Sequence, residues 1–309
     1  MTAGDAERRV WARLPDGTQR ALTERLPPAD LRTVLLSVAR SRAATVRPAD
    51  LLRRWREDRF VRPAASDPRV LAALEAELWH LLPDDVDGVE LSPVVPLGTC
   101  SAVGPVSQNR IVSTVRSTEV LSDATNALAI EAAVRRQRQH RTGEVHLAAC
   151  HRHLRAQVFA PGFSAHFRLF ALVSSARDAG SGRTEARLLA LHLGYWRAVL
   201  AALVPDAAPR IEYSVLDETV VRERLVDSVL PGLPDGQTAV VEEPTRTRGR
   251  GYYTDVALRL VVRDGADEVE LGDGGFTTWT AQLMGDAKER CLVSCLATER
   301  LATVMRRGG

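Results

Sequence analysis

The sequence predicts an α+β protein in which helices pack against an antiparallel β-sheet and a helical region precedes the sheet. Over roughly the first 85 residues, apolar side chains recur at spacings of three and four, which is typical of amphipathic helices. From about residue 88, strand-like and helix-like segments are interspersed without regular βαβ alternation, which favours an antiparallel sheet. We therefore expect a helical region at 1–87 and one domain at 88–309.

The composition is that of an ordinary globular protein. Of its 309 residues, 45% are apolar and 26% are charged, so the chain can bury a full core. The formal net charge is only +2, which gives no global electrostatic attraction to nucleic acid. No apolar run is long enough for a membrane span, and the charged N-terminus lacks the apolar segment of a secretory signal. We expect a cytoplasmic protein with no membrane partner.

The helical region divides at its prolines and aspartates. Helices are expected at 31–44 and 68–82, where the apolar spacing is clearest. Aspartates stand where three helices could begin: Asp30, Asp50 and Asp67. The basic run at 51–62 has two interpretations, a solvated helix face, which we favour, or a contact with RNA or a partner.

The second part of the chain alternates between the two periodicities. Helices are expected at 123–139, at 183–203 and from Thr298. The expected strands are 109–116, 145–159, 166–175, 209–216, 237–244, 252–262, 267–272 and 289–296.

The cysteines form no disulfide framework in a chain of this length: Cys100, Cys150, Cys291 and Cys295. Cys150 stands next to His151 and near His153, so a metal site is one interpretation of this segment. A strand that happens to carry these residues is the interpretation we favour, because no CxxC pair supports a metal.

The segment 154–167 reads LRAQVFAPGFSAHF and resembles a motif of class II aminoacyl-tRNA synthetases. That motif has the form F-R-x-E, then a loop, then an aromatic residue about twelve positions after the arginine. Arg155 takes the arginine position, Gln157 the glutamate position and Phe167 the aromatic position. The resemblance implies ATP binding, since a guanidinium fork suits the α-phosphate and an aromatic ring can stack on adenine.

The segment 295–305 reads CLATERLATVM and resembles the third motif of the same family, a strand of small residues leading into G-x-E-R-L. The resemblance places Arg300 at the γ-phosphate with Glu299 beside it, and Ala297 replaces the usual glycine. A surface helix with a Glu-Arg pair is the alternative.

The segment 248–260 reads RGRGYYTDVALRL and resembles the R-G-x-x-Y-Y-[TN] segment of histidyl-tRNA synthetases. In that family the arginine activates the amino-acid carboxylate and the second tyrosine lines the side-chain pocket. Arg248 and Tyr253 take those places, and Tyr252 precedes the second tyrosine. A cation at this point stabilises the charge that develops during adenylate formation.

Two further segments resemble the histidyl family. Gly274 and Gly275 match the glycines of its G-G-R-Y-D segment, although the following three positions hold Phe276, Thr277 and Thr278. In 120–135, Asp123 and Thr125 match the acid and threonine of L-R-P-E-x-T, which hold the substrate α-ammonium. Asp123 also suits a helix N-cap, and both roles can hold at once.

The departures from the family concern substrate choice. Leu169 and Val173 align with the Gln and Glu that read histidine, so the resemblance implies a less polar side-chain pocket that binds imidazole poorly. The family's helical insertion before the R-G-x-x-Y-Y segment and its anticodon-binding domain have no counterpart in this sequence.

The resemblance as a whole implies a class II synthetase-like catalytic domain at 88–309 that activates an amino acid other than histidine with ATP. The acyl group would pass from the aminoacyl-adenylate to a tRNA end, a carrier protein or a small amine. One or two Mg²⁺ ions are expected at the phosphates, with Glu299 or Glu289 as ligand. The alternative is a noncatalytic paralogue like the ATP phosphoribosyltransferase regulatory subunit, which the substitutions at Gln157 and Ala297 favour. A homodimer through 92–106 is expected, as in other class II cores.

Overall fold

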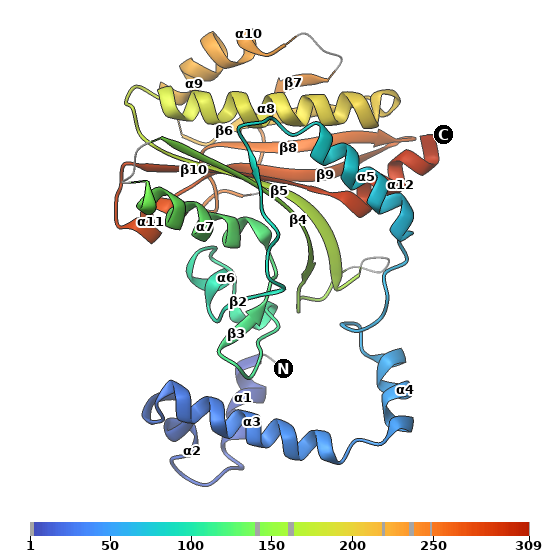
Figure 1. Ribbon diagram of the computed structural model, residues 1–309, viewed down its shortest axis with the longest axis vertical. Helices are drawn as coiled ribbons and strands as arrows, with labels where there is room; N and C mark the ends of the chain where they lie inside the picture. Colours follow the sequence, from blue (N-terminus) through green and yellow to red (C-terminus); the bar gives the residue numbers. More distant parts are fainter. Residues whose placement is uncertain are drawn as a thin grey trace.

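The computed structural model describes residues 3–139, 143–159, 164–217, 220–234, 238–247 and 249–308. It consists of a body built on one large sheet and an arm made by the first four helices, which extends from one end of the body (Figure 1).

The body is organised around an eight-stranded sheet with the order β1-β4-β5-β10-β9-β8-β6-β7. Its strands are β1 (Asp87–Gly88), β4 (Glu144–Leu154), β5 (His166–Arg177), β6 (Arg210–Val215), β7 (Ala239–Glu242), β8 (Thr254–Asp264), β9 (Asp267–Thr277) and β10 (Glu289–Ala297). Neighbouring strands are antiparallel, except that β1 runs parallel to β4 and β7 parallel to β6 at the two edges. A separate two-stranded ribbon pairs β2 (Val94–Pro96) with β3 (Thr118–Val120).

One face of the sheet is covered by long helices. These are α5 (Pro68–His80), α8 (Arg183–Leu203) and α12 (Thr298–Gly308), with the shorter α9 (Val220–Arg224), a π-helical turn at Leu225–Val229 and α10 (Leu230–Gly232) beyond them. Helix α8 buries Leu189, Leu193 and Trp196 completely, so its apolar stripe forms the centre of this core. The carboxylate of Asp67 caps α5 by accepting from the Arg69 amide at 2.8 Å.

The opposite face is covered by α7 (Ala124–Arg138) and α11 (Trp279–Met284), with α6 (Thr99–Ala102) nearby. The buried side of α7 is mostly alanine, which lets the helix approach the sheet closely, and Leu128 fills the space between them. The N-cap of α7 is Asp123, whose side chain accepts from the Thr125 amide at 3.0 Å. The helix therefore begins where the sequence predicted.

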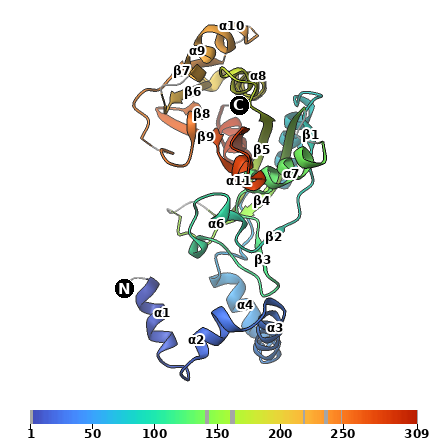
Figure 2. The same cartoon turned by 90° about the vertical axis from the view of Figure 1, so that its left-hand side faces the viewer.

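The arm is formed by α1 (Ala3–Trp11), α2 (Thr18–Arg20), a π-helical turn at Ala21–Arg25, α3 (Pro28–Ala44) and α4 (Pro48–Glu57). Figure 2 shows it lying beyond the ribbon of β2 and β3, away from the sheet. No described side chain of these helices is buried, and Val38, Leu52 and Trp55 are each more than half exposed. The arm thus contributes nothing to either core of the body.

Most of the expected elements are present, and the expected α+β architecture is confirmed. The strand expected at 109–116 is wrong: a 3₁₀ turn occupies Gln108–Arg110, and Ser113 makes only an isolated bridge to Glu119. The hydroxyl of Ser107 accepts from the Asn109 amide, and such local bonds favour a turn over a strand. Helix α5 falls within the expected N-terminal region yet packs into the core through Leu71, Leu74 and Leu78; the division at residue 87 stays a prediction.

Among the described residues, no helix combines the length and the apolar character that crossing a membrane requires.

Candidate functional site

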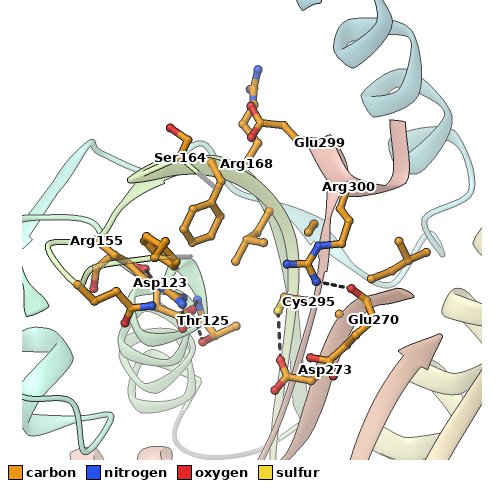
Figure 3. A pocket seen from close by; sticks show the side chains of 18 of the residues that line it. Asp123, Thr125, Arg155, Ser164, Arg168, Glu270, Asp273, Cys295, Glu299 and Arg300 are labelled. Atoms are coloured by element: carbon orange, nitrogen blue, oxygen red, sulfur yellow. Dashed lines mark hydrogen bonds and ion pairs between the residues drawn. The ribbon is translucent and has the colours of Figure 1, made fainter. Parts of the chain in front are cut away.

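The body contains a cavity of about 970 Å³, open to solvent, above the sheet face that α7 covers (Figure 3). Segments from much of the chain meet there: residues 64–66, the loop at 106–111, the start of α7, the β4–β5 hairpin, the turn before β8, the strands β9 and β10, and helix α12. Segments far apart in sequence thus contribute side chains to one pocket, as ligand sites usually require.

Three predicted residues form a cluster at one end of the pocket. Arg155 Nη2 lies 3.3 Å from Asp123 Oδ2, and Arg155 Nε donates to the Ser122 carbonyl at 2.9 Å. The other Asp123 oxygen accepts from both the amide and the hydroxyl of Thr125, the latter at 2.7 Å. Asp123 is therefore an N-cap and an ion-pair partner at once, and it stands between the two motifs that the sequence assigned to ATP and to the substrate amine.

The aromatic side of the cluster is formed by the β4–β5 hairpin. The Arg155 guanidinium lies 5.1 Å from the centre of the Phe167 ring, within the range of a cation–π contact. Phe159 meets Phe167 edge to face at 6.0 Å, and Gln157 also lines the pocket. The segment that follows α4 is tied to the hairpin, since Arg59 donates to the carbonyls of Ala156 and Gln157.

The second arginine of the pocket comes from α12. Arg300 donates to the backbone carbonyl of Glu270 on β9, which aims its guanidinium across the cavity from Arg155 (Figure 3). Glu299 accepts from Arg152 Nη2 at 2.8 Å, so its carboxylate is held at the rim. The same helix adds Arg306 and Arg307 to the lining. The cavity is consequently rich in guanidinium groups at its open end.

The turn before β8 places two tyrosines over the sheet. The Tyr252 and Tyr253 rings meet edge to face at 4.9 Å, and burial raises the pKa of both hydroxyls, which stay protonated at neutral pH. A Cβ at Gly275 would lie 2.6 Å from the Tyr253 ring, so only glycine allows the ring to rest on β9. Gly274 is constrained in the same way against Ser294 of β10.

Two acids of the pocket, Glu270 and Asp273, could not be recognised from the sequence. Asp273 of β9 lies beside Cys295 of β10, with Sγ and Oδ1 3.7 Å apart (Figure 3). Burial raises the pKa of the Asp273 carboxyl, and the nearby charge of Glu270 raises it further. Burial also raises the pKa of the Cys295 thiol, so it stays protonated. A single acid within a strand carries no motif, and only the pairing of β9 with β10 brings it to the pocket.

A buried histidine supports the cluster from beneath. The Nε2 atom of His153 accepts from the Ala124 amide at 2.8 Å, which makes it a second cap for the start of α7. Burial lowers the pKa of His153 to about 3, so the ring is neutral, as an acceptor at Nε2 must be. Its ring lies 5.9 Å from that of Phe167. His153 thus positions Asp123 and Phe167 relative to each other.

Most of the predicted site residues line this one cavity: Asp123, Thr125, Arg155, Gln157, Phe167, Leu169, Tyr252, Tyr253, Glu299 and Arg300. Gly274 and Gly275 lie in the strand that supports the tyrosines and do not line the cavity. Val173 does not line the cavity: it is buried in the core under α7, four residues beyond Leu169, the last residue of β5 that lines the cavity. Arg248 lies outside the described residues.

The metal interpretation of Cys150 finds no support in the geometry. Within the described ranges, no three His, Cys, Asp or Glu side chains are grouped to hold a metal ion. Cys150 packs toward α5 and α8, while His153, three residues further on, faces the α7 side, because neighbouring strand positions alternate. Glu289, one of the two expected Mg²⁺ ligands, lies outside the cavity in a buried ion pair with Arg136.

The remaining side chains fit ATP with Mg²⁺. Guanidinium groups of Arg155 and Arg300 on opposite walls suit a chain of phosphates, and the Phe167 ring offers a stacking surface. Mg²⁺ in phosphate sites needs only one or two carboxylates besides phosphate and water oxygens. Glu299 and Glu270 are the carboxylates that lie beside Arg300.

Comparison with known proteins identifies solved structures with a similar fold. No model of a protein family matches the chain, and no curated protein matches it significantly. Solved structures do match: histidyl-tRNA synthetase from S. aureus gives a TM-score of 0.56 at 15% identity, over 78% of this chain and 66% of that one. Histidyl-tRNA synthetase from Nostoc sp. PCC 7120 gives 0.59 at 13% identity, over 82% and 75% of the two chains.

A third match is a Bacillus halodurans protein described as an ATP phosphoribosyltransferase regulatory subunit/histidyl-tRNA synthetase, with a TM-score of 0.56 at 11% identity over 79% and 84%. The chain therefore has the class II aminoacyl-tRNA synthetase-like fold. Its structural neighbours include both synthetases and a regulatory relative, so the fold by itself assigns no activity. The match covers just under two thirds of the S. aureus synthetase, and the activity of that whole protein is not carried over.

Proposed function

We propose that the protein activates an amino acid with ATP, forming an aminoacyl-adenylate and releasing pyrophosphate. The observation that carries this proposal is the single cavity that joins Arg155 and Phe167 to the pair Asp123 and Thr125. A nucleotide and an amino acid bound at these two positions would have their reacting groups side by side. Holding two reactants in this way is a major source of rate acceleration.

The chemistry follows from the charges. An oxygen of the substrate carboxylate attacks the α-phosphorus of ATP, a new P–O bond forms, and the bond to the β-phosphate oxygen breaks. In this proposal Arg155 holds the α-phosphate and Arg300 holds the leaving pyrophosphate, which their positions on opposite walls of the cavity support. Mg²⁺ bound by the phosphates would neutralise their charge, with Glu299 or Glu270 as its protein ligand.

The amine end of the substrate is assigned to Asp123 and Thr125. Asp123 already accepts three hydrogen bonds, but a carboxylate offers about four lone-pair positions, so one remains for an ammonium. Arg248 is proposed to contact the carboxylate of the substrate, and this proposal rests only on the resemblance of its segment to that of histidyl-tRNA synthetases. The acyl acceptor, whether a tRNA end, a carrier protein or a small amine, is part of the same proposal.

The test is ATP–pyrophosphate exchange across the standard amino acids and a set of nonstandard ones. Exchange with some amino acid, and little with histidine, is expected, since Leu169 lines the pocket where a histidine site needs a polar group. Arg248→Ala should reduce exchange more than it weakens ATP binding, because its contact is realised mainly as charge develops. Strong exchange with histidine would contradict the pocket argument.

The second candidate is a noncatalytic regulatory relative. The observation that favours it is the ion pair between Arg155 and Asp123, which engages two groups that catalysis needs free to meet substrates. Binding of ATP without exchange for any amino acid in the panel would favour this reading. Exchange with any amino acid would exclude it.

A further inference from the structure

The floor of the cavity carries a carboxylate, Asp273, that forms no ion pair with any residue the structure describes. Asp273 lies on β9 where this strand pairs with β10, one position from the register pair of Gly274 and Ser294. Protein surrounds it, yet part of its surface stays open to the cavity. Its hydrogen-bonding neighbours are the thiol of Cys295 and the hydroxyl of Tyr253, which are both neutral.

Two arginines close to Asp273 bond to other groups. Arg259, the register partner of Asp273 on β8, directs its guanidinium to Glu270 at 2.9 Å and to Glu212 at 3.0 Å. Arg246 donates to the Leu258 carbonyl at 2.9 Å and lies over the Tyr253 ring, and its charge lowers the pKa of the Asp273 carboxyl without forming an ion pair with it. In the described part of the chain, no ion pair joins Asp273 to any arginine, lysine or histidine.

The other carboxylates of the cavity differ in this respect. Asp123 is paired with Arg155, Glu299 with Arg152, and Glu270 with Arg259. A carboxylate taken out of water without a cation is costly, and proteins normally pair or neutralise such groups. An unpaired acid that faces a ligand cavity indicates that the missing charge comes with the ligand.

The surroundings of Asp273 define the rest of the ligand. Leu169 and Val293 line the cavity with apolar surface next to Cys295, which suits an aliphatic stem. Tyr252 and Tyr253 offer aromatic surface beside the acid, and aromatic faces also attract cations. Apolar side chains beside an acid and two aromatic rings fit a methylene chain with a positive end.

We propose that Asp273 pairs with a cationic group at the end of the substrate side chain, so that the site selects an amino acid of the lysine, ornithine or arginine type. This inference rests on the proposed function for the placement of the α-amine and carboxylate. It modifies the expectation of a side-chain pocket less polar than a histidine site, which rests on Leu169 and Val173, by adding the acid Asp273.

The experiment compares the wild type with Asp273→Asn and Asp273→Ala, and uses Asp227→Asn as the matched control. Asp227 is exposed on the π-helical turn beyond α8, far from the cavity, so its variant carries the same chemical change on the surface. Calorimetric binding of L-lysine, L-ornithine, L-arginine and L-leucine is measured first, without ATP. Pyrophosphate exchange with the same four amino acids follows.

Wild type and Asp227→Asn should bind at least one cationic amino acid at least about tenfold more tightly than leucine. Asp273→Asn, which keeps the shape of the side chain, should remove about tenfold or more of that preference, the scale of a charged hydrogen bond. Binding of ATP by Asp273→Asn at the wild-type affinity shows that the variant is folded.

The outcomes separate this inference from the proposed function. Preference for leucine in the wild type, or an unchanged cation preference in Asp273→Asn, overturns the role of Asp273 even if exchange occurs. Cation binding that depends on Asp273 but is accompanied by no exchange upholds the role of Asp273 and removes the adenylating activity. No binding of any of the four amino acids overturns the inference as well.

Discussion

Arg136 of α7 and Glu289 of β10 form an ion pair from which solvent is fully excluded. Nη2 lies 3.1 Å from Oε1 and Nε lies 3.2 Å from Oε2, and neither side chain has any exposed surface. Arg136 also donates to the Gly143 carbonyl at the start of β4. The pair therefore fixes the C-terminal half of α7 to the middle of the sheet, while Asp123 fixes its beginning at the cavity.

The first prediction concerns this pair. Arg136→Met should lower the free energy of unfolding by about 3–5 kcal/mol, because it leaves the Glu289 carboxylate buried without a partner. The double variant Arg136→Met/Glu289→Leu should recover much of the loss, since it leaves no uncompensated charge. Urea denaturation followed by circular dichroism measures both. A double variant less stable than the single one would contradict the argument.

The second prediction concerns nucleotide binding. Arg155→Ala should weaken ATP binding by about 1.5–3 kcal/mol, the scale of a hydrogen bond to a charged group. Titration calorimetry with ATP and Mg²⁺ measures the change. Arg116→Ala is the matched control, because Arg116 is exposed before β3 and lies outside the cavity. Equal affinities of Arg155→Ala and the control would remove Arg155 from the nucleotide site.

The third prediction concerns acid sensitivity. Burial lowers the pKa of His192 to about 3, and the ring joins Ser174 and Ser294 at 2.9 and 2.8 Å. A histidine in the unfolded chain has a pKa near 6.5. Below about pH 6.5, His192 is therefore protonated in the unfolded chain and stays neutral in the folded protein. The contribution of neutral His192 to the free energy of unfolding is therefore fully present above this pH. It falls by about 1.4 kcal/mol per pH unit as the pH decreases toward 3.

Replacing His192 tests that argument. His192→Gln should have a shallower loss of stability between about pH 6.5 and 5 than the wild type, whatever its stability at neutral pH. His153 is buried with a similarly lowered pKa and should retain its own share of the slope. The control is His80→Gln, at the exposed end of α5. If the dependence of stability on pH is the same in His192→Gln as in the wild type, His192 is not the residue that causes the acid sensitivity.

The fourth prediction concerns assembly. A two-fold homodimer is expected to form through 92–106, which in the structure contains β2 and α6, and the apolar Leu97 between them is 52% exposed. Leu97→Asp should shift the mass measured by light scattering at micromolar concentration from dimer to monomer. Leu283→Asp, at an exposed apolar position of α11, serves as the control. A monomer mass for the wild type would count against the dimer.

The parts of the fold that the sequence predicts best have local signals. Helix α8 begins and ends at the expected residues 183 and 203, because its apolar periodicity and the glycine before it act within the segment itself. The start of α7 is likewise marked by Asp123, whose capping bonds reach only two residues. The parallel pairing of β1 with β4 is invisible in the sequence, since it involves only two residues of β1.

The residues of the site also differ in whether a local sequence pattern reveals them. Arg155 and Phe167 were predicted from one continuous segment, and the hairpin brings them together as expected. Asp273 could not be found, because nothing within β9 distinguishes it from Asp267 or Glu268, which the same strand exposes to solvent. Its position in the cavity depends on the register between β9 and β10 and on the tyrosines of a turn distant in sequence. Both are features of the tertiary structure, which local sequence patterns do not reveal.

The helical arm has a consequence for how the protein unfolds. Because α1 to α4 bury no described side chain, opening them removes no contact from either core, and the free energy of that opening is independent of global unfolding. Amide hydrogens of α3 and α4 should therefore exchange with deuterium long before those of α8 and β10. A protease should cut at the turn between α3 and α4, residues 45–47, under native conditions, and the body that remains should melt at the temperature of the intact chain.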